Sequence, residues 1–232
     1  MTSTLRQRLL AEYVGTLFLT AAVIGSGIAA VRLSPGDVGV QLLENALVTG
    51  AVLVALILTF QPVSAAFNPV VSAVGAALGD ISWREAGLQS LAQVAGCVSG
   101  AVLANVMFDL PAVTVSDTER SGGHLLVAET VATVGLLLVV FVAARRGRGA
   151  TIAVGVAGYI TAAYWFTSST SFANPAITVA RTLSDSFAGI APSSVPGFVV
   201  AQLVGAVIAL GLVRALTPTP VPHPVMSKGA LS

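Results

Sequence analysis

The chain has 232 residues, of which 55% are hydrophobic and 9% are charged, and its mean hydropathy is +0.91. A soluble domain carries about 25% charged residues, so this composition predicts an integral membrane protein. The formal net charge of +1 gives no indication of a nucleic-acid partner or of an acidic substrate.

Six apolar stretches are each long enough to cross a bilayer, which takes about 20 residues in a helix. They lie near residues 10–31, 41–60, 86–107, 125–144, 150–169 and 196–216. Together they predict one all-α transmembrane domain over 10–216, after a short N-terminal segment, 1–9, with no room for a soluble catalytic domain. The tail, 217–232, has a proline at every second position from 218 to 224 and is predicted to be disordered.

The first predicted span contains a glutamate, Glu12, and the fourth contains its counterpart, Glu129, because the sequence AEYVGT at 11–16 returns as AETVAT at 128–133. A carboxylate inside the membrane is a functional candidate, for example in a proton relay. We favour a structural role, in which each carboxylate accepts hydrogen bonds from free backbone N–H groups of a neighbouring re-entrant loop. The pair follows the repeat, and no lysine or histidine accompanies it.

Two segments between the spans contain an Asn-Pro pair, in Asn68-Pro69-Val70 after the second span and Asn174-Pro175-Ala176 after the fifth. Asparagine is a strong helix N-cap, and proline is favoured at the first helical position. Each pair therefore predicts a short helix that begins at membrane depth. Backbone N–H and C=O groups without hydrogen bonds are too costly in lipid. A helix end at this depth therefore persists only when it is buried in protein or lines a water-filled cavity. Two matched breaks predict a pore.

A third pair of similar segments completes an internal repeat, because AQVAG around Gln93 returns as AQLVG around Gln202. The three pairs occur in the same order and define two repeats, about 10–107 and 125–216. Each repeat holds three spans, an odd number, so the second must be inverted relative to the first. The two short helices then enter from opposite faces and point their positive N-terminal ends at each other. Such a centre repels cations and protons, while a neutral hydroxylated solute can bond to the two asparagine amides.

The distribution of basic residues predicts the orientation. Six spans place both termini on one side, and this side carries most of the arginine and lysine residues: Arg6, Arg8, Arg84, Arg145, Arg146, Arg148, Arg214 and Lys228. The opposite side carries Arg32, Arg120 and Arg181. The positive-inside bias therefore places both termini in the cytoplasm.

Two Asn-Pro half-helices, six spans and a repeated glutamate resemble the aquaporin, or major intrinsic protein, family over residues 9–216. The resemblance implies an aquaporin-like fold and a homotetramer of the inner (plasma) membrane, in which every subunit has its own pore and no cofactor or metal is needed. It also implies that Asn68 and Asn174 are the pore asparagines and that Ala176 is the usual third residue of the motif. Val70 departs from this pattern, since alanine is more common there, and it is expected to widen or shift the central site.

A larger departure follows the second motif. Members of the family usually have an arginine directly after the alanine, whereas this chain has Ile177. By ungapped spacing, the other constriction positions are Val48 (or Thr49 if a gap intervenes), Ala162 and Ser171. Water-selective members typically place a histidine where Ala162 falls. The resemblance therefore implies a selectivity filter that is wide, largely apolar and without fixed charge, most like that of bacterial aquaglyceroporins associated with arsenic resistance.

Arg181 lies four residues after Ile177, so the two share roughly one face of a short helix. It either reaches toward the pore and partly replaces the missing arginine, or it points to the outer mouth or pairs with Asp185; we favour the second reading. Aromatic residues near the end of the fifth span are predicted to form mainly an interfacial belt. They are Tyr159, Tyr164, Trp165 and Phe166.

These patterns predict a passive channel for small neutral solutes, of the glycerol, urea and arsenous acid type, together with water. A water-selective aquaporin is one alternative, and a gradient-coupled secondary transporter, suggested by the two glutamates, is another. An enzyme is not supported: no histidine and cysteine cluster has metal-ligand spacing, and no Ser-His-Asp set can be placed in the spans.

Overall fold

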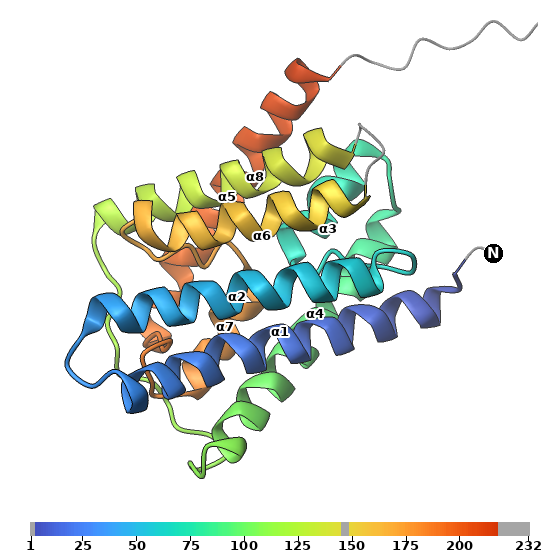
Figure 1. The fold of residues 1–232 in the computed structure, drawn as a ribbon. Helices are drawn as coiled ribbons and strands as arrows, with labels where there is room; N and C mark the ends of the chain where they lie inside the picture. The colour runs from blue at the N-terminus through green and yellow to red at the C-terminus, as the bar shows by residue number, and fades with distance from the viewer. Residues whose placement is uncertain (1–2, 145–148, 218–232) are drawn as a thin grey trace, which may run out of the picture.

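The structure, a computed structural model, describes residues 3–144 and 149–217, which form eight α-helices and two short 3₁₀ helices (Figure 1). Six helices are long and apolar enough to cross a membrane. These are α1 (Leu5–Leu33), α2 (Val38–Phe60), α4 (Trp83–Met107), α5 (Gly123–Ala144), α6 (Gly149–Phe166) and α8 (Val195–Leu216). The prediction of an all-α protein with six spans is thereby confirmed.

Two shorter helices begin at the Asn-Pro pairs, namely α3 (Pro69–Leu78) and α7 (Pro175–Ala180). The 3₁₀ helix η1 (Arg181–Leu183) continues α7, and η2 (Pro192–Ser194) leads into α8. In Figure 1, α3 and α7 lie among the long helices. Apart from residue 217, the predicted disordered tail lies outside the described residues, as do four of the basic residues used to orient the chain, Arg145, Arg146, Arg148 and Lys228.

The first helix begins earlier than the predicted span, at Leu5 instead of near residue 10. A capping box extends it: the Gln7 backbone nitrogen donates to Thr4 Oγ1 at 3.3 Å, and the Thr4 nitrogen donates to Gln7 Oε1 at 2.8 Å. Because these bonds satisfy N–H groups that a helix end leaves free, the helix continues through most of the segment 1–9.

The packing of the helices follows the predicted repeat. Helix α1 packs on α2 and α4, α5 packs on α6 and α8, and contacts of α2 with α6 and of α3 with α7 join the halves. Gly96 in α4 lies against the Tyr13 carbonyl and the Thr16 hydroxyl of α1. In the second half, Gly205 in α8 lies against α5 in the same way. Small residues at these crossings let the helix backbones approach closely. Close packing matters in a membrane, because an apolar side chain gains little by leaving lipid for a neighbouring helix.

Replacing Gly96 by alanine should destabilise the protein, because the new Cβ would overlap the Tyr13 carbonyl oxygen, and a backbone atom cannot move aside without shifting α1. Overpacking of this kind costs about 1–3 kcal/mol. Gly87 on the same helix is the matched control, since a Cβ there meets nothing within 4 Å. Thermal unfolding in detergent should show a lower Tm for Gly96→Ala and an equal or higher Tm for Gly87→Ala; equal shifts would contradict this account of the crossing.

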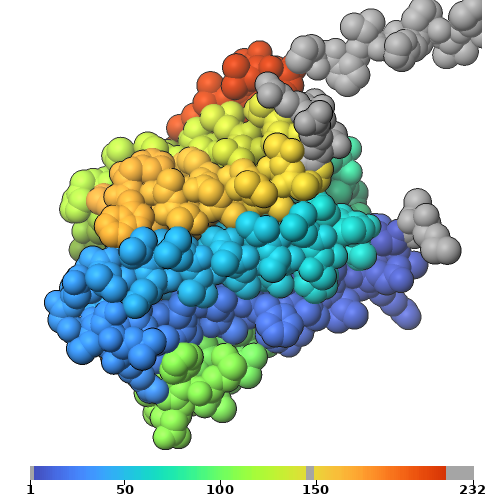
Figure 2. Space-filling view, viewed as in Figure 1, coloured from blue at the N-terminus to red at the C-terminus, as the bar shows by residue number. Residues whose placement is uncertain are grey.

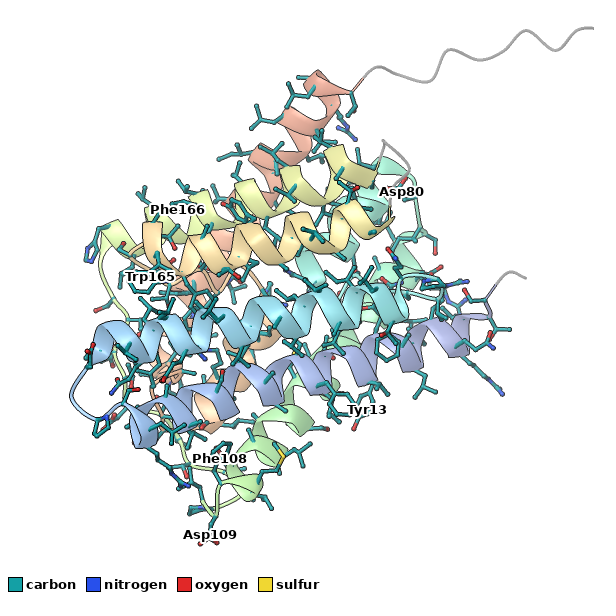
Figure 3. The ribbon with its side chains drawn as sticks, viewed as in Figure 1. Tyr13, Asp80, Phe108, Asp109, Trp165 and Phe166 are labelled. Atoms are coloured by element: carbon teal, nitrogen blue, oxygen red, sulfur yellow. The ribbon has the colours of Figure 1, made fainter. Side chains whose placement is uncertain are left out.

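Large hydrophobic side chains are exposed along the lengths of the helices. Figure 2 shows that α1, α2 and α6 form one continuous face. Exposed large hydrophobic side chains include Leu47, Val48, Leu91, Val127, Val154 and Val207. At one end of α6, Trp165 and Phe166 are also exposed, as an interfacial belt requires (Figure 3). Tyr164 differs from the prediction, because it is buried and turns into the protein.

Candidate functional site

Each Asn-Pro pair starts its short helix through the asparagine side chain. Asn68 Oδ1 accepts from the Val70 backbone nitrogen at 3.1 Å, and Asn174 Oδ1 accepts from the backbone nitrogens of Ala176 at 3.0 Å and Ile177 at 3.4 Å. Both asparagines have extended backbone, as N-caps do, and the proline that follows each one occupies the first helical position.

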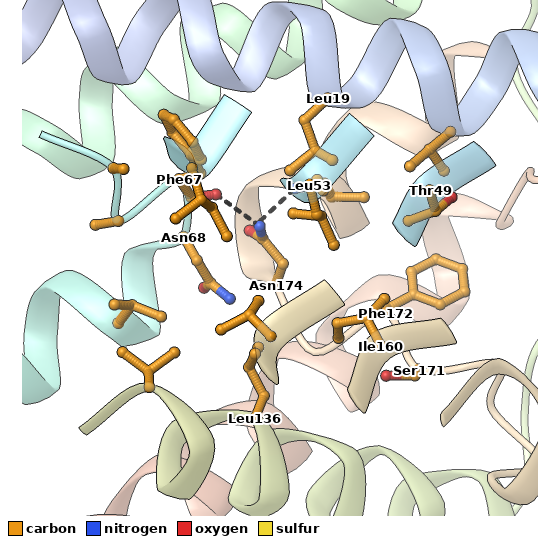
Figure 4. Close-up of a pocket in the computed structure, with 18 of the residues that line it drawn as sticks. Leu19, Thr49, Leu53, Phe67, Asn68, Leu136, Ile160, Ser171, Phe172 and Asn174 are labelled. Carbon is orange, nitrogen blue, oxygen red and sulfur yellow. Dashed lines mark hydrogen bonds between the residues drawn. The ribbon is translucent and has the colours of Figure 1, made fainter. Parts of the chain in front are cut away.

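The two helix starts meet through reciprocal hydrogen bonds. Asn68 Nδ2 donates to the Ala173 carbonyl at 2.7 Å. Asn174 Nδ2 donates to the Phe67 carbonyl at 2.8 Å, as Figure 4 shows. An amide nitrogen carries two hydrogens, so each asparagine keeps one N–H for a molecule beside it. The N-terminal ends of α3 and α7 also place two partial positive charges at this point.

Glu12 holds the loop before α3. Its carboxylate accepts hydrogen bonds from the backbone nitrogens of Ala66 at 2.8 Å and Phe67 at 2.7 Å, from Ser64 Oγ at 2.5 Å and from Gln93 Nε2 at 2.8 Å. Phe67 has a positive φ of 50°, which a bulky residue rarely adopts. The four bonds to one carboxylate stabilise this loop conformation in the protein interior.

Glu129 holds the loop before α7 in the same way. Its carboxylate accepts from the backbone nitrogens of Phe172, at 3.2 Å, and Ala173, and from Gln202 Nε2 at 2.8 Å. Ala173 has a φ of 45°, close to that of its counterpart in the first repeat. Both glutamates thus accept backbone N–H groups of re-entrant loops, and neither is among the described residues that line the central cavity defined next.

A cavity lies in the middle of the protein beside the asparagines, and we call it the central cavity (Figure 4). It follows three turns of α6 from Ile152 to Tyr164, which at about 1.5 Å per residue is roughly 18 Å. Most of its wall is apolar and includes Leu19, Val23, Leu53, Ile57, Leu136, Val140, Ile152, Val156, Ile160 and Ile177. Its polar side chains are Asn68, Asn174, Thr49, Tyr164, Ser171 and Arg181.

Hydroxyl groups gather at the outer end of the central cavity, by which we mean the end nearest the C-terminus of α1. Thr49 Oγ1 and the Tyr164 hydroxyl are 3.2 Å apart. Ser171 Oγ is buried and has no hydrogen-bond partner among the described residues. These groups offer donors and acceptors to a hydroxylated solute that has left bulk water.

Two of the predicted filter positions do not reach the central cavity. Val48 is 42% exposed on the outer face of α2, while its neighbour Thr49 lines the cavity. Ala162 is exposed, whereas Ile160 and Tyr164 line the cavity. One residue turns a helical side chain by about 100°, so a spacing error of one or two residues moves it to another face. Ser171 and Ile177 both line the cavity.

Val70 is not among the described residues that line the central cavity either. Its side chain is buried in a cluster with Leu137, Phe141 and Ala206, and Val71 lines the central cavity in its place. Val70 therefore has no direct contact with the cavity, and its expected effect on the central site stays a prediction. Ala176, which is also buried, likewise lies outside the described lining residues.

Arg181 is buried at the outer end of the central cavity. Its Nε donates to the Ala188 carbonyl, and its guanidinium carbon lies 3.5 Å from the centre of the Phe172 ring. Asp185, the predicted partner, instead accepts from Ser116 Oγ and the Asp117 nitrogen, each at 3.4 Å. The predicted pairing of Arg181 with Asp185 is therefore wrong, whereas its place at the outer end of the cavity agrees with the prediction that it points to the outer mouth. The wall of the cavity is not free of fixed charge.

Tyr164 is the lining residue that the sequence reasoning assigned elsewhere. A signal for it was present, because Ile152, Val156, Ile160 and Tyr164 recur every fourth residue and so share one face of α6. All four line the central cavity.

Comparisons with known proteins agree with this architecture. The sequence profile described as "Major intrinsic protein" matches residues 1–163. The chain is 47% identical to aquaglyceroporin AqpS of Rhizobium meliloti, over 91% of each protein. It is 32% identical to aquaporin NIP1-4 of Oryza sativa subsp. japonica, over 68% of this chain and 57% of that protein. The aquaglyceroporin structure from Plasmodium falciparum has the same fold, with a TM-score of 0.68 at 19% identity, covering 90% of this chain and 95% of the other.

Proposed function

The chain belongs to the major intrinsic protein family, and on this premise we propose that it is a passive channel for small neutral solutes such as glycerol, urea and arsenous acid, together with water. The observation that carries the proposal is the central cavity, in which two amide groups and a cluster of hydroxyls interrupt an apolar wall. The relative from Rhizobium meliloti is an aquaglyceroporin by name, which supports solutes larger than water.

The apolar wall and the polar groups have separate roles in this proposal. A solute in a narrow apolar passage loses its water, so it passes only where the protein replaces the lost hydrogen bonds. The free N–H groups of Asn68 and Asn174 serve this purpose at the centre, and Thr49, Tyr164 and Ser171 serve it at the outer end. The facing N-termini of α3 and α7 disfavour cations at the same point.

The position of Ile177 favours larger solutes over strict water selectivity. Its side chain lines the central cavity with hydrocarbon only, where the family usually has the guanidinium of an arginine. We therefore propose that Asn68 and Asn174 orient the solute, while Thr49, Tyr164, Ser171 and Ile177 set the size limit.

A gradient-coupled transporter is the second candidate, and the two buried glutamates were its motivation. Their carboxylates accept hydrogen bonds from backbone and side-chain donors, and neither glutamate is among the described residues that line the central cavity. A carboxylate engaged in this way supports a fixed loop instead of a proton pathway. The channel is therefore the better-supported function.

Flux into liposomes tests the proposal directly. Purified protein should speed the equilibration of glycerol, urea and arsenous acid in a stopped-flow experiment without any ion gradient. Flux no faster than in empty vesicles, from protein shown to be folded, would contradict the channel. Uptake against a concentration gradient that collapses with the proton or sodium gradient would establish the transporter.

We further propose that the channel is a homotetramer in the plasma membrane with both termini in the cytoplasm. The exposed apolar faces of the long helices support contact with lipid or with other subunits. Arg6, Arg8, Arg84 and Arg214 lie on the side assigned to the cytoplasm, in accord with the positive-inside rule.

A further inference from the structure

A second cavity lies beyond the outer end of the central cavity, and we call it the outer cavity. Its wall includes Asn45, Arg120, Tyr164, Arg181 and Phe187. Tyr164 and Arg181 line both cavities, so they stand at the junction between them. A solute on the proposed route must pass this junction.

The guanidinium of Arg181 is fixed at the junction by contacts on two sides. Nε donates to the Ala188 carbonyl, and the group lies over the ring of Phe172. The ring face attracts a cation, and the planar group can stack on it. Within the described part of the chain, Nη1 and Nη2 have no protein acceptor. These nitrogens therefore have N–H groups to offer a solute between the two cavities.

A second arginine increases the positive charge at this place. Arg120 Nε donates to the Gly189 carbonyl at 2.8 Å, and Arg120 Nη2 donates to the Phe187 carbonyl at 3.4 Å. Its guanidinium carbon lies 5.2 Å from the centre of the Phe172 ring, the ring that Arg181 also contacts. No aspartate or glutamate is among the described residues that line either cavity, so a solute on the route meets two arginines and no carboxylate.

We propose that Arg181 is a specificity-determining residue of the channel, which excludes cations at the junction and donates hydrogen bonds to the oxygen atoms of neutral solutes. This inference rests on the proposed channel function. Arg181 follows Ile177 by four residues, about one helical turn, so the charge enters the route farther out than a residue at 177 would place it. The passage beside Ile177 stays apolar while the junction keeps a cation filter.

The apolar wall explains why a guanidinium at the junction can exclude cations. A fixed charge in a narrow passage with apolar surroundings is screened less than one in water, so it acts strongly on an approaching ion. A neutral molecule meets no such barrier and gains donors. The junction should therefore separate molecules of equal shape by their charge.

Urea and guanidinium form a suitable test pair, because both are small, planar and of similar size but only guanidinium is charged. Their permeabilities should be measured in liposomes with the wild type and with Arg181→Gln, Arg181→Met and Arg181→Lys. Glutamine removes the charge and can still donate to the Ala188 carbonyl. Methionine removes both the charge and the hydrogen-bond donor. The ratio of guanidinium to urea permeability should rise about tenfold or more in the two neutral variants, which corresponds to a barrier lower by about 1.4 kcal/mol for guanidinium. In the lysine variant, which keeps the charge, the ratio should stay low.

Arg32→Gln is the matched control. Arg32 also donates to a carbonyl, that of Phe108 at 2.7 Å, and lies over the Phe108 ring at 5.3 Å, but it lines neither cavity. Its replacement should leave the ratio unchanged. A folded neutral variant at Arg181 that keeps the wild-type ratio while urea still permeates would overturn the role of Arg181 and leave the channel intact. Wild-type protein without urea flux would instead refute the channel itself.

Discussion

Replacing Glu12 by leucine should leave little folded protein. The carboxylate accepts four hydrogen bonds, two of them from backbone N–H groups of the loop before α3, and it is fully buried. A buried donor left without a partner costs about 1–3 kcal/mol. Four such losses are comparable to the whole stability of a typical domain, about 5–15 kcal/mol.

Yield of monodisperse protein and Tm in detergent measure this effect. Glu12→Gln should have an intermediate yield and Tm. Its amide keeps one acceptor oxygen, but its NH₂ group would face N–H or O–H donors that now bond to the carboxylate. Glu44→Leu is a control, since within the described residues the Glu44 carboxylate accepts a single hydrogen bond, from Ser34 Oγ at 2.9 Å. A Glu12→Leu protein with the yield and Tm of the control would show that the carboxylate does not hold the loop.

Replacing Ile177 by arginine should lower glycerol and arsenous acid permeability by about tenfold or more, which corresponds to a barrier higher by about 1.4 kcal/mol. Ile177 lines the central cavity one turn from Arg181, so a second guanidinium would narrow the apolar passage and add positive charge next to an existing one. Water flow should fall much less, because a single water molecule needs a smaller opening.

The comparison requires stopped-flow permeabilities of water, glycerol and arsenous acid for the same reconstituted protein. Ile177→Val, which removes one methylene and adds no charge, should keep all three rates close to those of the wild type. Glycerol and arsenous acid rates that remain unchanged in a folded Ile177→Arg protein would place the size limit elsewhere, for example at Tyr164, which lines both cavities.

The main elements of the fold follow directly from local patterns in the sequence. Span length depends on hydropathy alone, and the starts of α3 and α7 are set by an N-cap residue followed by proline. The repeat could be aligned because Glu12 and Gln93 each have a counterpart, Glu129 and Gln202. The structure places each pair in the same arrangement, a glutamine amide donating to a glutamate carboxylate.

Which side chains of α2 and α6 face the central cavity could not be predicted in the same way. Val48 and Ala162 were assigned by counting along the chain, and loops of unequal length make such counts inaccurate by a residue or two. The direction of Arg181 depends on how the loops on either side of α7 and η1 fold back, because its contacts are with the Phe172 ring and the Ala188 carbonyl. Tyr164 stands beside Trp165 and Phe166, so composition alone gave it the same interfacial role.

The reciprocal hydrogen bonds that the asparagine side chains make between the two Asn-Pro loops have a consequence for biogenesis. The Asn68 amide donates to the Ala173 carbonyl, and the Asn174 amide donates to the Phe67 carbonyl. Each repeat therefore depends on the other for the acceptor of its asparagine side chain. During synthesis the first loop must wait, with its amide unsatisfied, until the segment before α7 has been inserted. The middle of the conduit is therefore among the last contacts to form, and a nascent chain that ends before residue 173 has no assembled route through the bilayer.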